Sequence, residues 1–184
     1  MSHDRNGPQT GAEAAASVPD SFEEGVLALM PALRRYSRSL MHSDPDGEDL
    51  LQDCVEKVLA RRAQWRGANL RAWAFTIMTN LYRNRHRRKA QHPEVELDEE
   101  LGLAVQEQDA DPLERQRLVR ALDRLSADNR AVLMLVVIEG YRYQDVAEMM
   151  AIPIGTVMSR LSRARRQLAE AMKEDNVIAL RRPK

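Results

Sequence analysis

The chain of 184 residues carries 28 Lys and Arg against 28 Asp and Glu, so its formal net charge is zero. Only 4% of the residues are aromatic, and Leu, Ala, Met, Arg and Glu are frequent, a composition typical of helices rather than sheets. The length allows one ordinary domain or two small ones. We expect neither a membrane span nor a signal peptide, because no apolar run is long enough and no basic segment precedes an apolar one at the N-terminus.

Three helices are predicted in the first half, after a Gly-, Ala-, Ser- and Pro-rich segment at 1–20 that we expect to be disordered. Pro31 is expected to kink or restart the first helix, and Asn69 is a candidate N-cap for the third. A common apolar face would join the helices into a small domain at 21–90. The helices are expected at 22–41, from the turn 43–47 to Leu59, and from Leu70 to about Arg88.

The segment 91–111 is acidic and has little periodicity, so we interpret it as a flexible linker. It contains no Lys or Arg from Glu94 to Asp111, whereas the preceding stretch from Arg61 to Lys89 contains no Asp or Glu. Such segregation suggests that separate surfaces meet separate partners, although each run alone could be a solvated face. Since the linker is tethered beside the basic run, we expect it to fold back over 83–89.

Four further helices are predicted from 112 to about 175, followed by a tail at 176–184. Pro112 is expected at the first position of one helix, with Leu118, Leu122 and Leu125 as its apolar stripe. Ser126 is the expected N-cap of the next, which Gly140 would stop. The fold class predicted from these signals is all-α, with two small helical domains joined by the acidic linker.

The segment 143–161 has the layout of a helix-turn-helix. Val146 and Ala147 would pack the first helix, Ile152 the turn, and Val157 and Leu161 the second helix. Thr156, Ser159, Arg160, Arg163 and Arg166 remain on or near the outer face of the second helix. A helix with such a face fits the major groove of DNA, where Arg reads guanine edges.

Residues for catalysis or metal binding are not arranged in a known pattern. The four histidines are scattered, and the sequence has no phosphate-binding glycine loop, nucleophile elbow or metal-ligand spacing. We therefore expect no enzyme activity, no cofactor and no metal. Cys54, the only cysteine, lies on an apolar stripe and is interpreted as an inert core thiol. A single cysteine excludes an intramolecular disulfide and suits the cytoplasm.

Two pairs of segments resemble one known family. The segments 139–147 and 152–165, EGYRYQDVA and IPIGTVMSRLSRAR, look like the promoter-reading domain of bacterial sigma factors. The segments 49–53 and 69–75, DLLQD and NLRAWAF, look like the N-terminal domain of the same family. The resemblance covers about 22–173 and is closest to the extracytoplasmic-function group, which retains only these two domains. Arg142, Ala151 and Met158 depart from the usual residues of the family.

The resemblance implies three sets of functional residues. It implies that the chain binds the clamp of the largest subunit of core RNA polymerase through the second helix, and the flap of the second-largest subunit. It also implies promoter DNA and an anti-sigma factor as partners. The polymerase-binding residues would be Asp49, Leu50, Gln52, Asp53 and Glu56. The −10 element would be read and melted by Trp65, Arg66, Asn69, Arg71, Asn80, Arg83, Arg87 and Lys89. The −35 element would be read by Thr156, Ser159, Arg160, Arg163 and Arg166.

Three alternatives remain open from the residues alone. A helix-turn-helix repressor or activator would explain the second half but leave the acidic-then-basic first half without a role. A sigma-like decoy for an anti-sigma factor should carry a receiver domain, which these residues do not suggest, and would not need such basic helices. An RNA-binding module is a more distant alternative. Transcription in vitro with purified core polymerase separates the sigma-factor interpretation from these three alternatives.

Overall fold

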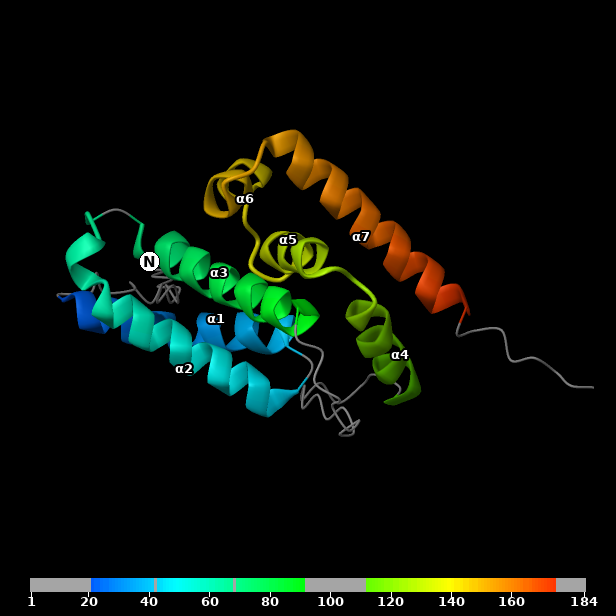
Figure 1. Cartoon of the computed structure of the whole chain (residues 1–184), viewed down its shortest axis with the longest axis horizontal. Coiled ribbons are helices and arrows are strands. Elements are labelled where there is room, and N and C mark those ends of the chain that lie inside the picture. The colour runs from blue at the N-terminus through cyan, green and yellow to red at the C-terminus, as the bar shows by residue number, and fades with distance from the viewer. Residues whose placement is uncertain (1–20, 42, 68, 92–111, 175–184) are drawn as a thin grey trace, which may run out of the picture.

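The computed structural model describes residues 21–41, 43–67, 69–91 and 112–174, and every regular element in these ranges is a helix. The helices form two groups that lie side by side (Figure 1). The N-terminal bundle comprises α1 (Phe22–Leu40), α2 (Asp44–Ala60), the short 3-10 helix η1 (Arg62–Gln64) and α3 (Leu70–Gln91). The C-terminal bundle comprises α4 (Pro112–Asp123), α5 (Ala127–Val137), α6 (Tyr143–Met150) and α7 (Ile154–Glu174). Gln91, the first residue of the expected linker, belongs to α3, and the rest of that linker and both tails lie outside the described residues.

Side-chain caps fix where several of these helices begin. Ser21 and Glu24 form a reciprocal capping box at the start of α1, with hydrogen bonds of 3.2 and 3.1 Å. Asn69 Oδ1 accepts from the backbone N–H of Ala72 at 3.1 Å, which confirms Asn69 as the N-cap of α3. The predicted cap of α5 is also confirmed, because Ser126 Oγ accepts from the backbone of its third helical residue at 3.3 Å.

The expectation that Pro31 restarts the first helix is wrong, since α1 continues through it. Pro31 cannot donate to the carbonyl of Leu27. Both residues lie on the exposed side of α1, where Leu27 is 68% exposed, so water can reach that carbonyl. Leu33 and Tyr36 are fully buried just beyond the proline and hold the helix on the core. The helix survives because tertiary packing outweighs the loss of one hydrogen bond on its wet side.

The core of the N-terminal bundle contains polar groups that are satisfied internally. The Tyr36 hydroxyl lies 2.8 Å from Thr79 Oγ1, and both side chains are fully buried. Burial raises the pKa of Tyr36 far above its ordinary value. The Tyr36 ring stacks on that of Phe75 at 5.0 Å between centroids. The two rings join α1 to α3 at the centre of the bundle, and Met78 and Tyr82 extend the buried side of α3.

The C-terminal bundle contains the predicted helix-turn-helix as α6 and α7. Val146 and Val157 are fully buried, and Leu161 is 2% exposed. The turn passes through Ala151, whose φ of 52° lies in the left-handed region that glycine usually occupies. The expected apolar stripe of α4 is only partly right, because Leu118 is 45% exposed whereas its neighbour Val119 is buried.

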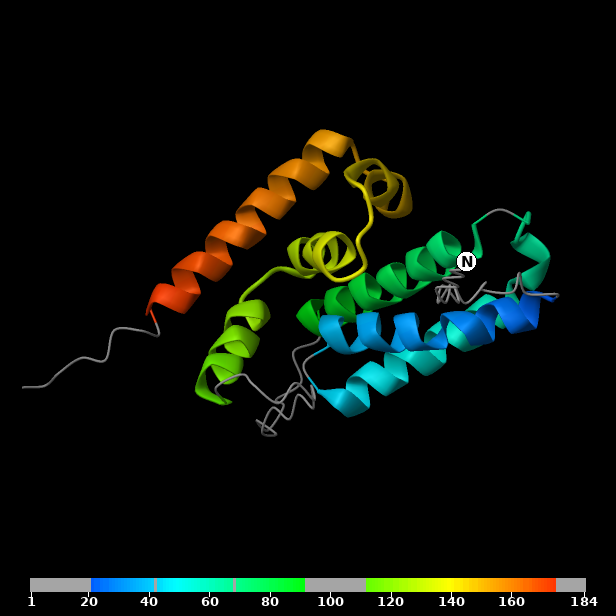
Figure 2. The ribbon, with the colours of Figure 1, turned by 180° about the vertical axis from the view of Figure 1, so that it is seen from behind.

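The two bundles dock on each other, which the sequence did not predict. Helix α5 contacts both α1 and α3, and α6 contacts α3. The buried apolar residues form one cluster that continues from the N-terminal bundle into the C-terminal bundle. The reverse view shows α5 lying against α1 and α3 while α4 and the end of α7 extend away (Figure 2). Helix α3 is therefore covered on two sides, by its own bundle and by the C-terminal one.

Leu50 gives a direct test of the α2 packing. Its side chain is fully buried, whereas Leu59 of the same helix is 45% exposed. We expect Leu50→Ala to lower the free energy of unfolding by about 2–5 kcal/mol, because the truncation removes buried apolar contacts and leaves a cavity. Leu59→Ala should change it by less than about 1 kcal/mol. Urea denaturation followed by circular dichroism measures both, and equal effects would contradict the placement of α2.

Candidate nucleic-acid interface

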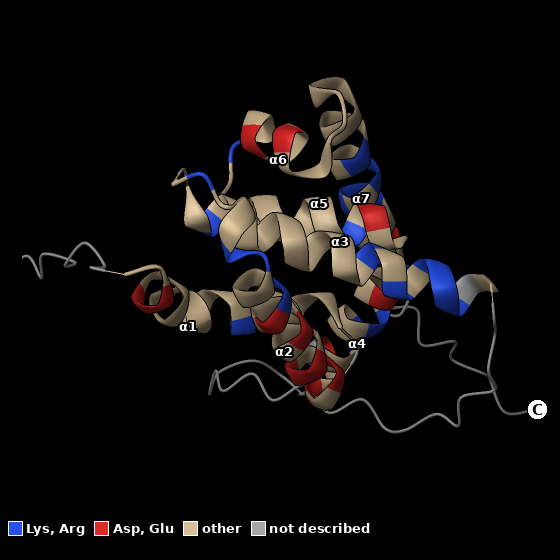
Figure 3. Ribbon diagram, turned by 60° about the vertical axis from the view of Figure 1, so that its left-hand side comes forward, with Lys and Arg blue, Asp and Glu red and all other residues tan. Residues whose placement is uncertain are grey.

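The outer face of α7 carries the polar residues expected to read DNA. Val157, Leu161 and Ala164 are buried against the rest of the bundle, so Ser159, Arg163 and Arg166 lie on the opposite side of the helix. Arg163 and Arg166 are exposed. Thr156 and Ser159 are half-buried, and the Ser159 hydroxyl donates to the Thr156 carbonyl at 3.0 Å. Lys and Arg gather along this helix (Figure 3).

Arg160 differs from its neighbours on α7, because its guanidinium is engaged inside the molecule. One nitrogen lies 2.6 Å from the Asp128 carboxylate of α5, and the side chain is only 20% exposed. The other terminal nitrogen is buried without a hydrogen-bond partner among the described residues. In this conformation Arg160 therefore faces α5 rather than the surface that Arg163 and Arg166 form.

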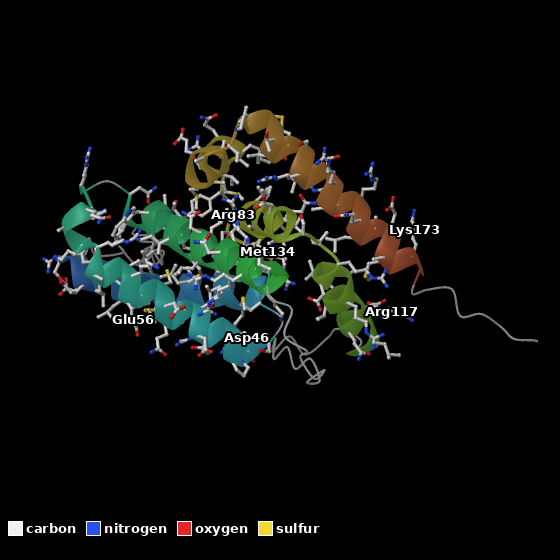
Figure 4. The ribbon with its side chains drawn as sticks, viewed as in Figure 1. Asp46, Glu56, Arg83, Arg117, Met134 and Lys173 are labelled. Carbon is white, nitrogen blue, oxygen red and sulfur yellow. The ribbon has the colours of Figure 1, made fainter. Side chains whose placement is uncertain are left out.

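The basic end of α3 approaches the same carboxylate from the other bundle. Arg83 Nε donates to Asp128 at 2.7 Å, while Arg87 and Lys89 are exposed. Figure 4 places the labelled Arg83 in the region where the bundles meet. An open cavity of 340 Å³ lies beside this contact. It is lined by Arg83, His86, Arg87, Ser126, Ala127 and Asp128.

The loop before α3 contains residues that are already used in folding. The Trp65 ring is half-buried and lies 5.2 Å from that of Phe22, so it packs on α1. Asn69 has its side-chain oxygen engaged in capping α3. Arg66 and Asn80 are exposed and available to a partner. Trp65 and Asn69 therefore have a structural role in addition to any role in binding.

Arg71, the remaining residue of the expected −10 set, points to the C-terminal bundle. Its Nη2 donates to Glu139 at 2.8 Å and its Nε donates to the Tyr141 hydroxyl at 3.2 Å. The guanidinium carbon lies 5.1 Å from the Phe75 ring centre and 5.6 Å from that of Tyr141. Burial raises the pKa of Tyr141, and the hydrogen bond from Arg71 opposes that rise.

The acidic face of α2 is exposed on the side away from the C-terminal bundle, as Figure 3 shows. Asp49, Gln52, Asp53 and Glu56 all lie there, and Gln52 donates to Glu56 at 3.1 Å. The Asp53 carboxylate is also paired with an arginine of α3. Leu50 must be removed from this set, because its side chain is fully buried in the core. It follows Asp49 by one position, and adjacent positions on a helix point in different directions.

Sequence reasoning missed the residues that join the two bundles, namely Asp128, Arg130 and Glu139. Arg130 is 2% exposed and Glu139 has a side chain with no exposed surface. Charged residues are seldom buried to this degree unless they are paired. Their partners lie up to 104 positions away in the chain, so no local pattern marks them.

Metal binding, membrane insertion and cysteine chemistry find no support among the described residues. They contain no group of three or more His, Cys, Asp and Glu side chains that could hold a metal ion. None of the described helices combines the length and the apolar character needed to cross a bilayer. Burial raises the pKa of the Cys54 thiol to about 12, which leaves it protonated and unreactive at neutral pH.

Comparison with known proteins assigns these two bundles to a family. Residues 115–168 match the model for sigma-70 region 4, and residues 26–79 match that for the Sigma2 domain of PhyR. The chain is 33% identical over 161 residues to the ECF RNA polymerase sigma factor EcfG of Rhodopseudomonas palustris, covering 86% of this chain and 88% of that protein. This chain belongs to the ECF sigma factors. The family consists of regulatory proteins rather than enzymes.

Solved structures agree with this assignment. The present chain is similar to the sigma factor RpoE of Bartonella quintana, whose structure was solved in complex with the anti-sigma factor NepR. The two share 35% identity, with a TM-score of 0.68 over 84% of this chain and 98% of that one. The fold also resembles that of the anti-anti-sigma factor PhyR from the same organism. That likeness has a TM-score of 0.57 and 17% identity, over 82% of this chain and 50% of PhyR.

Proposed function

We propose that this ECF sigma factor binds core RNA polymerase in the cytoplasm and directs it to a specific set of promoters, without catalysing a reaction itself. The observation that carries the proposal is the similarity to an ECF sigma factor along nearly the whole chain, which includes both helical bundles. The surfaces described above agree with it. An exposed acidic face and an exposed basic helix lie on different bundles, so one chain can hold a protein partner and a nucleic acid at once.

Each surface is assigned one partner. The exposed carboxylates of α2 at Asp49, Asp53 and Glu56 would pair with basic residues of polymerase. The exposed side chains of α3 and its preceding loop would hold the −10 element, where base extraction needs stacking and phosphate contacts. The outer face of α7 would enter the major groove at the −35 element, with Arg163 and Arg166 as its longest donors.

We further propose that an anti-sigma factor restrains this protein and that release follows a stress signal. The support is the structure of RpoE, a 35% identical neighbour, in complex with the anti-sigma factor NepR. Both bundles of this chain are covered by that likeness, which extends over 84% of it. An inhibitor that contacts both bundles would block both of the proposed DNA-binding surfaces.

The second candidate function is that of a decoy for an anti-sigma factor. The observation in its favour is that residues 26–79 match the Sigma2 domain of PhyR, and PhyR is described as an anti-anti-sigma factor. Two findings speak against it. Residues 115–168 match sigma-70 region 4, and EcfG, which is similar over most of the chain, is a sigma factor. A decoy would bind the inhibitor without supporting transcription.

Transcription in vitro decides between the two candidates. Purified core polymerase is mixed with the chain and with fragmented genomic DNA of the source organism, and the transcripts are sequenced. We expect transcripts that start at a limited set of sites with a common upstream pair of elements. Core polymerase alone is the control. Specific starts that require the added chain support the sigma factor, whereas their absence from the chain-containing reaction supports the decoy.

Asp49 tests the polymerase-binding face. It is exposed on α2, and no hydrogen bond or ion pair of its side chain occurs among the described contacts. We expect Asp49→Arg to weaken binding to core polymerase by at least about tenfold, or about 1.4 kcal/mol, because a repulsive charge replaces an attractive one. Glu114→Arg, the same change at an exposed position of α4, is the matched control. Equal affinities of both variants in a pull-down would remove α2 from the interface.

Arg163 tests the outer face of α7. We expect Arg163→Ala to weaken binding to the −35 element, within a promoter found by the transcription experiment, by about 1–3 kcal/mol. Arg165→Ala is the control, because Arg165 is also exposed but lies toward the flank of the helix. Binding by holoenzyme is measured on the promoter and on a duplex with the element scrambled. A loss on both duplexes alike would mark a phosphate contact, and no loss would exclude this face from the groove.

A further inference from the structure

Glu139 connects the two bundles through a buried carboxylate. It lies in the loop between α5 and α6, and its side chain has no exposed surface. Arg35 of α1 donates to both of its oxygens, at 3.0 and 2.9 Å, and Arg71 of α3 donates to one of them at 2.8 Å. Both arginines belong to the N-terminal bundle. A carboxylate removed from water needs such partners, so in this conformation the charge of Glu139 depends on the other bundle.

Arg130 makes a second connection in the opposite direction. This arginine of α5 donates to the backbone carbonyls of Ser39 and Met41, at 3.0 and 3.2 Å, where α1 ends. Carbonyls in the last turn of a helix lack partners within the helix, and a cation there also interacts favourably with the helix dipole. Asp123 accepts from the same guanidinium at 2.9 Å. The C-terminal bundle thus caps a helix of the N-terminal bundle.

The docking brings a carboxylate of the C-terminal bundle against the proposed −10 surface. Asp128 accepts from Arg83 of α3 at 2.7 Å and lies 2.6 Å from Arg160 of α7. One carboxylate therefore engages an arginine of the proposed −10 set and one of the proposed −35 set. Both arginines are at most 22% exposed. Helix α6 also packs on α3, so a helix of the helix-turn-helix covers part of the −10 reader.

We propose that the free chain is held in this closed, self-inhibited conformation by a latch formed by Glu139, Arg35 and Arg71. The inference rests on the proposed function, because it takes α3 and α7 to be the DNA-reading helices. The latch keeps Arg83 on Asp128 and away from phosphates, whereas Arg160 is paired with Asp128 within the C-terminal bundle. Binding of DNA at the −10 surface requires the latch to release, so that the bundles separate and Arg83 becomes accessible.

The chemistry of the latch allows it to open. All three charges can be hydrated once the bundles separate, and Arg35 and Arg71 are already 53% and 39% exposed in the closed form. A desolvated ion pair gains little over the same charges in water, so opening the latch itself costs little. Removing one partner shifts the balance strongly, since the closed form then brings two arginines together without a carboxylate.

The distance between the bundles in the free chain is the direct test. Spin labels on Ala60→Cys of α2 and Ala169→Cys of α7, both exposed positions, report it by double electron–electron resonance. Cys54 remains unlabelled because its thiol is fully buried and its pKa is about 12. We expect a narrow distance distribution for the otherwise unchanged chain. Glu139→Gln should add a longer, broader population and raise the open fraction at least about tenfold.

Two further variants sharpen the test. Arg35→Gln breaks the latch from the other bundle and should produce the same longer population, with an effect less than additive to that of Glu139→Gln. Glu114→Gln removes one carboxylate from an exposed position of α4, and should leave the distribution unchanged. A broad distribution in the unchanged chain, or no shift in either latch variant, would overturn the proposal.

DNA affinity supplies the functional readout. The isolated chain is titrated against a fluorescent duplex of random sequence, and Glu139→Gln should bind it about tenfold more tightly than Glu114→Gln, since both lose one negative charge but only the first opens the molecule. Equal affinities would overturn self-inhibition. Failure of the sigma-factor function appears in a different experiment, as loss of transcription with core polymerase, and leaves the distance measurement unaffected.

Discussion

Helix α3 has to satisfy two packing partners at once, and the arrangement of the molecule follows from this constraint. Its buried residues Ala74, Phe75 and Met78 complete the core of the N-terminal bundle, while its other side receives α5 and α6. Phe75 serves both sides, since its ring lies 5.0 Å from Tyr36 and 5.6 Å from Tyr141. The sides of α3 that meet the C-terminal bundle also carry charge, and Arg71 and Arg83 form ion pairs across the interface.

The neutral overall charge of the chain conceals an internal compensation. Basic residues of α1 and α3 meet carboxylates of the C-terminal bundle, as with Arg35 and Glu139 or Arg83 and Asp128. Arg130 reverses the pattern by donating to the end of α1. Among the exposed charges, acidic residues predominate on α2 and basic residues on α7 (Figure 3). A chain without net charge can in this way present one surface to a basic protein and another to a polyanion.

Local signals predicted most of the fold, and long-range pairing explains what they missed. The caps Asn69 and Ser126 and the turn of the helix-turn-helix depend on residues within a few positions, so the sequence reveals them. The docking of the bundles depends on pairs such as Arg35 with Glu139, which lie 104 positions apart and follow no period. Leu50 entered the polymerase-binding set through the family resemblance, although its own position on the helix points inward.

The same arginine cannot serve a carboxylate of its own chain and a phosphate of DNA. Arg83 and Arg160 illustrate the competition, because Asp128 occupies both in the closed form. A carboxylate and a phosphate oxygen make comparable charge-assisted hydrogen bonds, so exchanging one for the other changes the energy little at each contact. Whether the arginines bind carboxylate or phosphate then depends on how many such contacts each partner offers at the same time. A duplex offers phosphates along its whole length, whereas the closed chain offers a few fixed carboxylates, and any partner that holds the bundles apart removes Asp128 from the reach of Arg83.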